Sequence, residues 1–347
     1  MDIGEPFLSH HSRLPCRSEA ALADPAGRPS LHRGHRGSDS LSTKSRSNFV
    51  TRTWNGLFRH EDWNIGIVRE PIAVFLRPNV QPRIDWLPPL QSGLYLADPF
   101  GIVQDGRTFV LCEEFDYRSL KGRIVGIELH QLDASASLGS AIDLPIHCSY
   151  PYLFEHEGQV YCVPETSQAL EVSLYRAKQL PCDWVKIATL IRDFPASDST
   201  VFEHDGYWWL ACSVEWDDLF LWCAPDFLGP WRQHANNPVK KDIRSSRSAG
   251  TPFMHDGELY RPAQDCSRTY GGRIVLNRVK ILTPTEFEEE EAGAIEPYSQ
   301  GPYPDGLHTV SKVGDVTLVD GKRHVFIRSA FRSTLKRTLA RYSTALA

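Results

Sequence analysis

A segment that reads as two apolar strands joined by a tight turn recurs along this chain. The copy at residues 250–266 has a His-Asp-Gly turn, and its second strand ends in an acid. The aromatic residues that open four such copies are Phe100, Tyr152, Phe202 and Phe253, and subtraction gives steps of 52, 50 and 51 residues. Periods of about 40 to 50 residues built from short strands are typical of β-propeller blades. The repeat therefore predicts an all-β propeller.

A fifth, degenerate unit follows at residues 305–326. Ahead of the first copy, residues 63–68 alternate like a strand, and a Pro-rich connector around residues 78–89 follows it. Propellers commonly close when a strand from the N-terminal end completes the last blade. We therefore expect a five-bladed β-propeller with four-stranded antiparallel blades, closed by an N-terminal strand. The acidic run at residues 286–291 is most simply a solvated surface.

The composition divides the chain into three parts. Residues 1–48 are rich in Ser, Arg, His, Gly and Pro, which is typical of a disordered tail. Residues 49–329 are expected to form the propeller. Residues 330–347 form a basic tail whose apolar residues have the spacing of a short helix.

Composition and charge also exclude several functions. A formal charge of -5 offers no electrostatic basis for binding nucleic acid. No apolar run reaches the ~18 residues of a membrane-spanning helix, and the N-terminus does not read as a secretion signal, which predicts a cytoplasmic protein. The eight cysteines lack Cys-x-x-Cys spacing and are expected to be buried reduced thiols. We expect no cofactor and no metal.

Acidic residues recur at the strand ends of the predicted hairpins. Residues equally far from a hairpin turn face each other, which predicts Asp98 opposite Glu113 and Tyr150 opposite Glu165. By the same count Asp198 faces Ser213. Asp265 ends the second strand of the fourth blade, and Asp305 and His308 precede the fifth.

These strand ends lie on one face of a propeller, so the acids are expected to converge at one mouth of the channel. A single acid there would most simply cap a turn or be solvated. Crowded carboxylates instead repel one another unless a cation or ligand offsets them, so the set predicts a ligand site. Arg244, Arg247 and Arg261 are the candidate cations, because arginine binds carboxylates and other anions bidentately; salt bridges between blades are an equal alternative. The lone His308 is not assigned to a metal.

Several motifs carry a resemblance to a known family. They are Ala97-Asp-Pro-Phe, Ser149-Tyr-Pro-Tyr-Leu-Phe-Glu, Pro164-Glu-Thr-Ser, Asp198-Ser-Thr, Asn237-Pro-Val with Arg244-Ser-Ser-Arg, Tyr260-Arg-Pro-Ala-Gln-Asp-Cys and Gly301-Pro-Tyr-Pro-Asp-Gly. Across residues 50–328 the chain resembles the N-terminal domain of plant glucosamine inositolphosphorylceramide transferases and its bacterial relatives. In the plant proteins a separate glycosyltransferase domain follows. We expect that domain to be missing here, so the resemblance does not imply transferase activity, and a glycosyltransferase is a possible partner.

The layout also resembles, more distantly, five-bladed propeller glycosidases of the arabinanase and xylosidase type. That resemblance implies an Asp in the first blade as general base, an orienting Asp in the second and a Glu in the third as general acid. Asp98 matches the first role, whereas Tyr150 and Asp198 stand at the other two positions. If the chain hydrolyses glycosides, Asp98 would be the base, and Asp198 or Glu165 the acid.

The sequence thus predicts a carbohydrate-active domain that recognises or processes a glycan or glycoconjugate at the channel mouth. Glu113, Tyr150, Arg244, Arg247, Arg261, Asp265, Asp305 and His308 are the expected substrate-binding residues. The alternative is a non-catalytic sugar-binding or scaffold domain that accompanies a glycosyltransferase.

Overall fold

The computed structural model describes residues 59–129, 138–328 and 330–331. The tail expected at residues 1–48 and most of the basic tail expected at residues 330–347 lie outside the described residues. At the start of that basic tail, the N–H of Phe331 donates to the carbonyl of Ile327 at 2.9 Å, which is a helical turn.

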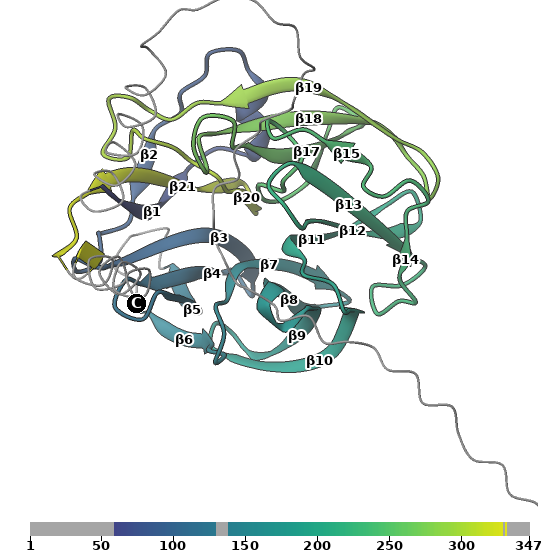
Figure 1. Ribbon diagram of the computed structural model, residues 1–347, viewed down its shortest axis with the longest axis horizontal. Coiled ribbons are helices and arrows are strands. Elements are labelled where there is room, and N and C mark those ends of the chain that lie inside the picture. Colours follow the sequence, from purple (N-terminus) through teal and green to yellow (C-terminus); the bar gives the residue numbers. More distant parts are fainter. Residues whose placement is uncertain (1–58, 130–137, 329, 332–347) are drawn as a thin grey trace, which may run out of the picture. The chain divides into compact units, whose positions relative to one another are not determined.

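Five small antiparallel sheets form a ring, which confirms the five-bladed β-propeller (Figure 1). The first blade consists of β3 (Leu94–Gln104), β4 (Arg107–Asp116), β5 (Lys121–Leu129) and β6 (Gly139–Ile142). The second consists of β7 (Ser149–His156), β8 (Gln159–Glu165), β9 (Glu171–Gln179) and β10 (Asp183–Arg192). The third consists of β11 (Ser197–His204), β12 (Tyr207–Ser213), β13 (Asp218–Ala224) and β14 (Arg232–Gln233), and β15 (Lys240–Lys241) also pairs with β13.

The fourth blade consists of β16 (Phe253–His255), β17 (Glu258–Asp265), β18 (Arg273–Leu282) and β19 (Phe287–Ile295). The fifth combines β20 (Val310–Val313) and β21 (Val316–Val325) with β1 (His60–Val68) and β2 (Ile84–Trp86) in the order β2-β1-β21-β20. The strands β3, β7, β11, β16 and β20 are the innermost of their blades.

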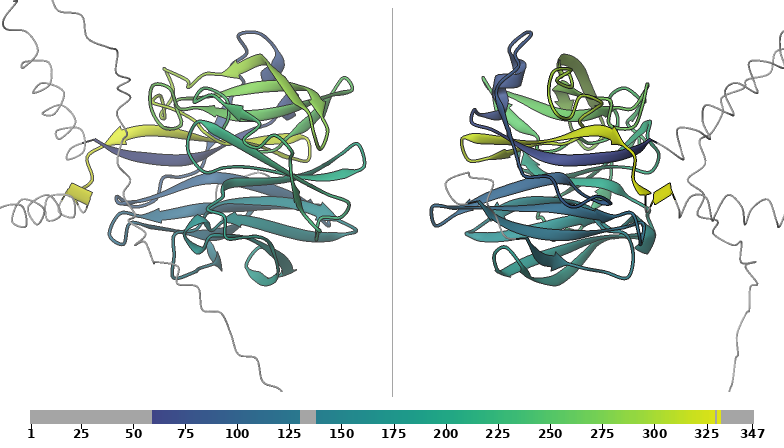
Figure 2. Two further views of the ribbon diagram at one scale, coloured as in Figure 1. Left: turned by 45° about the vertical axis from the view of Figure 1, so that its right-hand side comes forward. Right: turned by 90° about the vertical axis from the view of Figure 1, so that its left-hand side faces the viewer.

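The ring closes through the N-terminal end of the propeller, as expected. β1 pairs with β21 along its whole length, from His60 opposite Val325 to Val68 opposite Thr317 (Figure 2). The Pro-rich connector is more than a connector, because β2 lies within it and completes the fifth blade. β2 is an edge strand, the one place in a sheet where neighbouring prolines do not interrupt a ladder.

The register corrects the repeat alignment. Phe100 pairs with Leu111, whereas Phe202 pairs with Trp209 and lies two residues closer to its turn. The steps counted between the aromatic residues were therefore measured between positions that are not equivalent in their blades. The hairpin turns are equivalent, because Asp105, Glu157, Asp205 and Asp256 all adopt a positive φ of about 50° and each precedes a glycine.

The acidic run at residues 286–291 is not simply a solvated surface. It begins β19, and the side chain of Glu289 is only 1% exposed because it is bonded to Arg261 and Lys240. The apolar core lies between the blades, where Phe100 of β3 packs edge-on against Tyr150 of β7 at 4.8 Å between ring centroids. Within the described ranges all cysteines are free, and all but Cys182 are buried.

Candidate functional site

Three blades begin with the same irregularity. Asp98, Tyr150 and Asp198 have φ angles of 52°, 43° and 52°, in the left-handed region that side-chain-bearing residues rarely adopt. At each point two residues of the inner strand oppose one of its neighbour, which is a β-bulge. Backbone strain of this kind costs about 1–3 kcal/mol per residue and is concentrated at functional sites.

The bulges overturn the predicted pairing. Ala97, not Asp98, lies opposite Glu113; Ser149 lies opposite Glu165. In the third blade Ser197 lies opposite Ser213. Counting from the turn misplaces the paired residue by one position in each of these three blades, because the count assumes a ladder without a bulge.

The bulge releases one backbone N–H from each ladder, and a carboxylate of another blade accepts it. The N–H of Asp98 donates to Asp320 of β21 at 3.3 Å, and the N–H of Tyr150 donates to Asp98 at 3.2 Å. The N–H of Asp198 donates to Glu165 at 3.1 Å. The acids therefore converge at one end of the channel, as the sequence predicted, and they join the blades there.

His308 lies between two of these carboxylates. Its Nδ1 is 2.5 Å from Oδ2 of Asp320 and its Nε2 is 3.6 Å from Oδ1 of Asp98. Burial lowers the pKa of His308, but the two carboxylates outweigh it and raise that pKa to about 9. The ring also stacks on Trp63 at 4.1 Å. At neutral pH His308 is therefore a cation, fixed in place by both acids.

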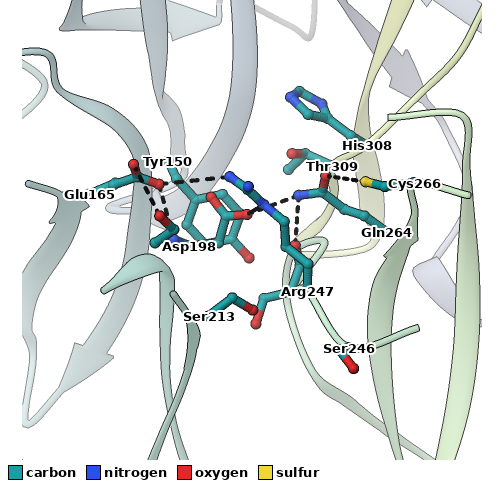
Figure 3. A network of polar contacts seen from close by, with 12 residues as sticks. Tyr150, Glu165, Asp198, Ser213, Ser246, Arg247, Gln264, Cys266, His308 and Thr309 are labelled. Carbon is teal, nitrogen blue, oxygen red and sulfur yellow. Dashed lines mark hydrogen bonds and ion pairs between the residues drawn. The ribbon is translucent and has the colours of Figure 1, made fainter. Parts of the chain in front are cut away.

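Asp198 is bound by groups from the fourth blade (Figure 3). Nε of Arg247 bonds to Oδ2 of Asp198, and the amide of Gln264 donates to the same oxygen at 2.9 Å. Arg247 also lies 4.0 Å from Glu165. Burial raises the pKa of Asp198 to about 6, against the lowering effect of Arg247. Arg247 is thus the cation that links two of the predicted acids.

Glu113 has the least satisfied carboxyl of the set. It is 5% exposed, and its Oε1 has no hydrogen-bond partner among the described residues. Nδ1 of His147 accepts the N–H of Gly122 at 2.9 Å, so a neutral His147 carries its proton on Nε2, 3.6 Å from that Oε1. Burial and the neighbouring carboxylates, Asp98 first, raise the pKa of Glu113 well above its usual range. Burial and the neighbouring carboxylates therefore favour the neutral form of Glu113.

Tyr150 takes the place of a carboxylate in the second blade. Its hydroxyl lies 3.0 Å from the hydroxyl of Thr200 and accepts the N–H of Gly250 at 2.8 Å. Gly250 has a φ of 124°, and a Cβ there would lie 1.8 Å from the carbonyl oxygen of Val310. The phenol thus connects the second, third and fourth blades across the channel.

We refer to these groups together as the channel cluster. It contains the acids Asp98, Glu113, Glu165, Asp198 and Asp320, the cations Arg247 and His308 and the phenol of Tyr150, each at most 9% exposed. In the described part of the chain, Asp98, His308 and Asp320 place potential metal ligands within 4.8 Å of one another. A metal there would have to replace the proton of His308, because both ring nitrogens face carboxylates.

Four of the predicted site residues lie outside the channel cluster. Arg244 is a surface residue paired with Asp242, and Arg261 is bonded to Glu289 and to the carbonyls of Ser245 and Ser246. Asp265 is bonded to Ser267 and Arg273. Asp305 is bonded to His324.

The sequence prediction missed Asp320, Gln264, Thr309 and Tyr270. Thr309 donates its hydroxyl to Asp98 at 2.7 Å, and the Arg247 guanidinium lies 5.4 Å from the Tyr270 ring. Successive side chains on a strand point to opposite faces, and in β17 it is Gln264, not the neighbouring Asp265, that faces Asp198. An acid inside the apolar strand β21 was the signal for Asp320.

The comparisons with known proteins confirm the resemblance predicted from the motifs. A sequence model described as glucosamine inositolphosphorylceramide transferase 1, N-terminal, matches residues 90–300. The protein of that name from Oryza sativa subsp. japonica is 36% identical over 225 residues, and the one from Arabidopsis thaliana is 33% identical over 229. The matches cover 61% and 62% of this chain but only 30% of each relative.

Solved structures of glycosidases share the fold. The catalytic domain of a GH62 α-L-arabinofuranosidase from Coprinopsis cinerea has a TM-score of 0.51 at 13% identity and covers 77% of this chain and 98% of that domain. An α-L-arabinofuranosidase from Podospora anserina also has a TM-score of 0.51, at 11% identity, with 66% of this chain and 81% of that one covered. Likeness at this level of identity establishes the fold alone. No helix in the described ranges is long and apolar enough to cross a membrane.

Proposed function

Because this chain belongs to the family of the N-terminal domain of glucosamine inositolphosphorylceramide transferase 1, we propose that its channel mouth recognises the sugar headgroup of a glycolipid or related glycoconjugate. The observation that carries the proposal is the channel cluster, in which acids from blades one, two, three and five meet two cations. Carboxylates accept hydrogen bonds from sugar hydroxyls or from an ammonium group, and such charge-assisted bonds are about twice as strong as neutral ones.

The charge balance of the cluster supports a ligand that donates hydrogen bonds. Five carboxyls face two cations, and burial and mutual repulsion raise the pKa values of Asp98, Glu113 and Asp198. A bound donor would stabilise the ionised carboxylates that are otherwise disfavoured. Amino sugars and sugar hydroxyls have this chemistry, and glucosamine appears in the names of the relatives.

In this proposal the propeller is a recognition domain and a glycosyltransferase domain or partner supplies the transfer chemistry. The relatives are named as transferases, and the chain matches less than a third of their length. Most cluster oxygens already accept bonds from protein groups: the carboxylate of Asp98 is bonded to Thr309 and Tyr150, and that of Asp198 to Arg247 and Gln264. These bonds fix the orientation of the carboxylates, which suits positioning a bound sugar better than proton transfer.

Glycoside hydrolysis is the second candidate. The observation that favours it is the pKa of Asp198, about 6, because a general acid works best with a pKa near the working pH. Asp98 would then act as the base. Glu165 is the other acid considered from the sequence. Its carboxylate already accepts hydrogen bonds from the N–H of Asp198 and the hydroxyl of Ser167.

The test is binding of glucosamine, N-acetylglucosamine and inositol phosphate, measured by saturation-transfer difference NMR. We expect at least one to bind, and Asp198→Asn to weaken it by about 10-fold or more, since a bond to a charged group contributes ~1.5–3 kcal/mol. Asp205→Asn is the matched control, because Asp205 lies in the turn at the other end of the same hairpin and its side chain is 83% exposed. Binding of none of the three probes would refute the proposal. Hydrolysis of aryl glycosides by the wild type but not by Asp98→Asn would favour the second candidate.

A further inference from the structure

Trp216 is an exposed aromatic residue beside the channel cluster. It lies in the loop between β12 and β13, at the strand end that also carries Ser213. Trp216 is 42% exposed, whereas the other tryptophans in the described ranges are buried or half-buried. Its exposure leaves a large apolar ring surface accessible to a ligand.

A chain of ring contacts leads from Trp216 to the cluster. Its ring centroid lies 5.7 Å from that of Tyr270, with 41° between the planes. Tyr270 in turn lies 5.2 Å from the His308 ring and 5.4 Å from the guanidinium of Arg247. His308 pairs with Asp98, and Arg247 is bonded to Asp198. An accessible aromatic surface therefore adjoins the buried carboxylates through a half-buried tyrosine.

Buried polar groups hold in place the two loops that carry Trp216 and Tyr270. The carboxylate of Asp218, which is 4% exposed, accepts the N–H groups of Val214 and Glu215 at 2.8 and 3.2 Å. In the loop that carries Tyr270, the carbonyl of Tyr270 accepts a hydrogen bond from the ammonium of Lys322, which is fully buried. A surface whose loops are fixed before a ligand arrives loses less entropy on binding.

We propose that Trp216 and Tyr270 form a stacking platform for the ring of a hexopyranose, so that the edge of the ring reaches the carboxylates of the channel cluster. This inference rests on the proposed function and names the ligand class. A pyranose ring has an apolar face of C–H bonds and a polar rim, which match an aromatic surface beside hydrogen-bonding groups. The platform selects sugars with an unobstructed C–H face and orients them over Asp98 and Asp198.

The experiment uses the full chain labelled with 5-fluorotryptophan and glucosamine as the first probe, followed by N-acetylglucosamine and inositol phosphate. The fluorine signal that disappears in Trp216→Phe identifies Trp216. We expect a bound sugar to shift this signal and to leave that of the buried Trp209 unchanged. The affinity of Trp216→Ala should fall about 3- to 10-fold, since an aromatic contact contributes ~0.5–1.5 kcal/mol, while Trp216→Phe retains part of it.

Tyr207→Ala is the matched control. Tyr207 is also 42% exposed and lies at the opposite end of β12, so the variant should bind as the wild type does. Unchanged affinity and an unshifted signal in a wild type that binds sugar would overturn the platform and leave the proposed function standing. If no probe binds the wild type, both are overturned. Loss of binding in Tyr207→Ala as well would also contradict the platform, because it would place the contact elsewhere.

Discussion

The backbone N–H of Tyr150 donates to the carboxylate of Asp98 at 3.2 Å, so the bulge of one blade is bonded to the acid that begins the preceding blade. The same carboxylate accepts the hydroxyl of Thr309 and faces the ring of His308. Asp98 therefore joins the first, second and fifth blades. Asp98 thus has a structural role, and its mutation should disturb stability and binding together.

Tyr150→Phe should lower the free energy of unfolding by about 1–3 kcal/mol, because it leaves the buried N–H of Gly250 without its acceptor. Urea unfolding followed by circular dichroism measures this difference. Tyr152→Phe is the control, since Tyr152 is also buried but no hydrogen bond to its hydroxyl is described. Equal stability of Tyr150→Phe and the wild type would show that the phenol does not connect the blades.

His308 should make stability depend on pH in the alkaline range. Its pKa is raised from 6.5 to about 9 in the folded chain, so its contribution is fully present below pH 6.5 and is lost as the pH rises through 9. The stability advantage of the wild type over His308→Asn should therefore shrink between pH 6.5 and 9. Urea titrations at several pH values test this, and an advantage that grows over that range would contradict the paired imidazolium.

Glu113→Gln should preserve the fold. Burial raises the pKa of Glu113 and so favours its neutral form, which glutamine resembles. A raised pKa contributes stability at low pH that is lost as the pH rises. The wild type should therefore lose stability relative to the variant as the pH rises above 4.5, the ordinary pKa of this side chain. Melting temperatures measured below and above that pH test this, and a stability difference that does not change with pH would contradict the raised pKa.

The three arginines considered as cations for the site should behave differently. Arg261→Met should cost about 3–5 kcal/mol of stability, because it leaves the buried Glu289 with Lys240 alone. Arg244→Ala should change neither stability nor sugar binding, since the Arg244 side chain is 68% exposed. Arg247→Met should weaken sugar binding, because it removes the cation that positions Asp198. Denaturation and NMR titration of the three variants distinguish these roles, and sugar binding that depends on Arg244 would refute the assignment.

The hairpins and their number could be predicted from the sequence. Alternating apolar residues and turns such as Asp105-Gly106 act locally, so four hairpins, a degenerate fifth and closure by an N-terminal strand are visible without a structure. The convergence of Asp98, Glu113, Glu165 and Asp198 also followed, because equivalent strands in a propeller run in the same direction. The hairpins depend on neighbours along the chain, and the convergence follows from repeating the same hairpin around a ring.

Tertiary structure decided the details of the site. The bulge at Asp98 displaces the ladder by one residue, and its freed N–H is satisfied by Asp320, 222 positions away in the sequence. Arg247 and Arg261 look alike in the sequence, yet the folded chain bonds one to Asp198 and the other to Glu289. Turns and strand patterns are local properties that the amino-acid sequence determines by itself. The strained bulges and the partners of buried charges depend on groups from other blades, which meet only when the ring has closed.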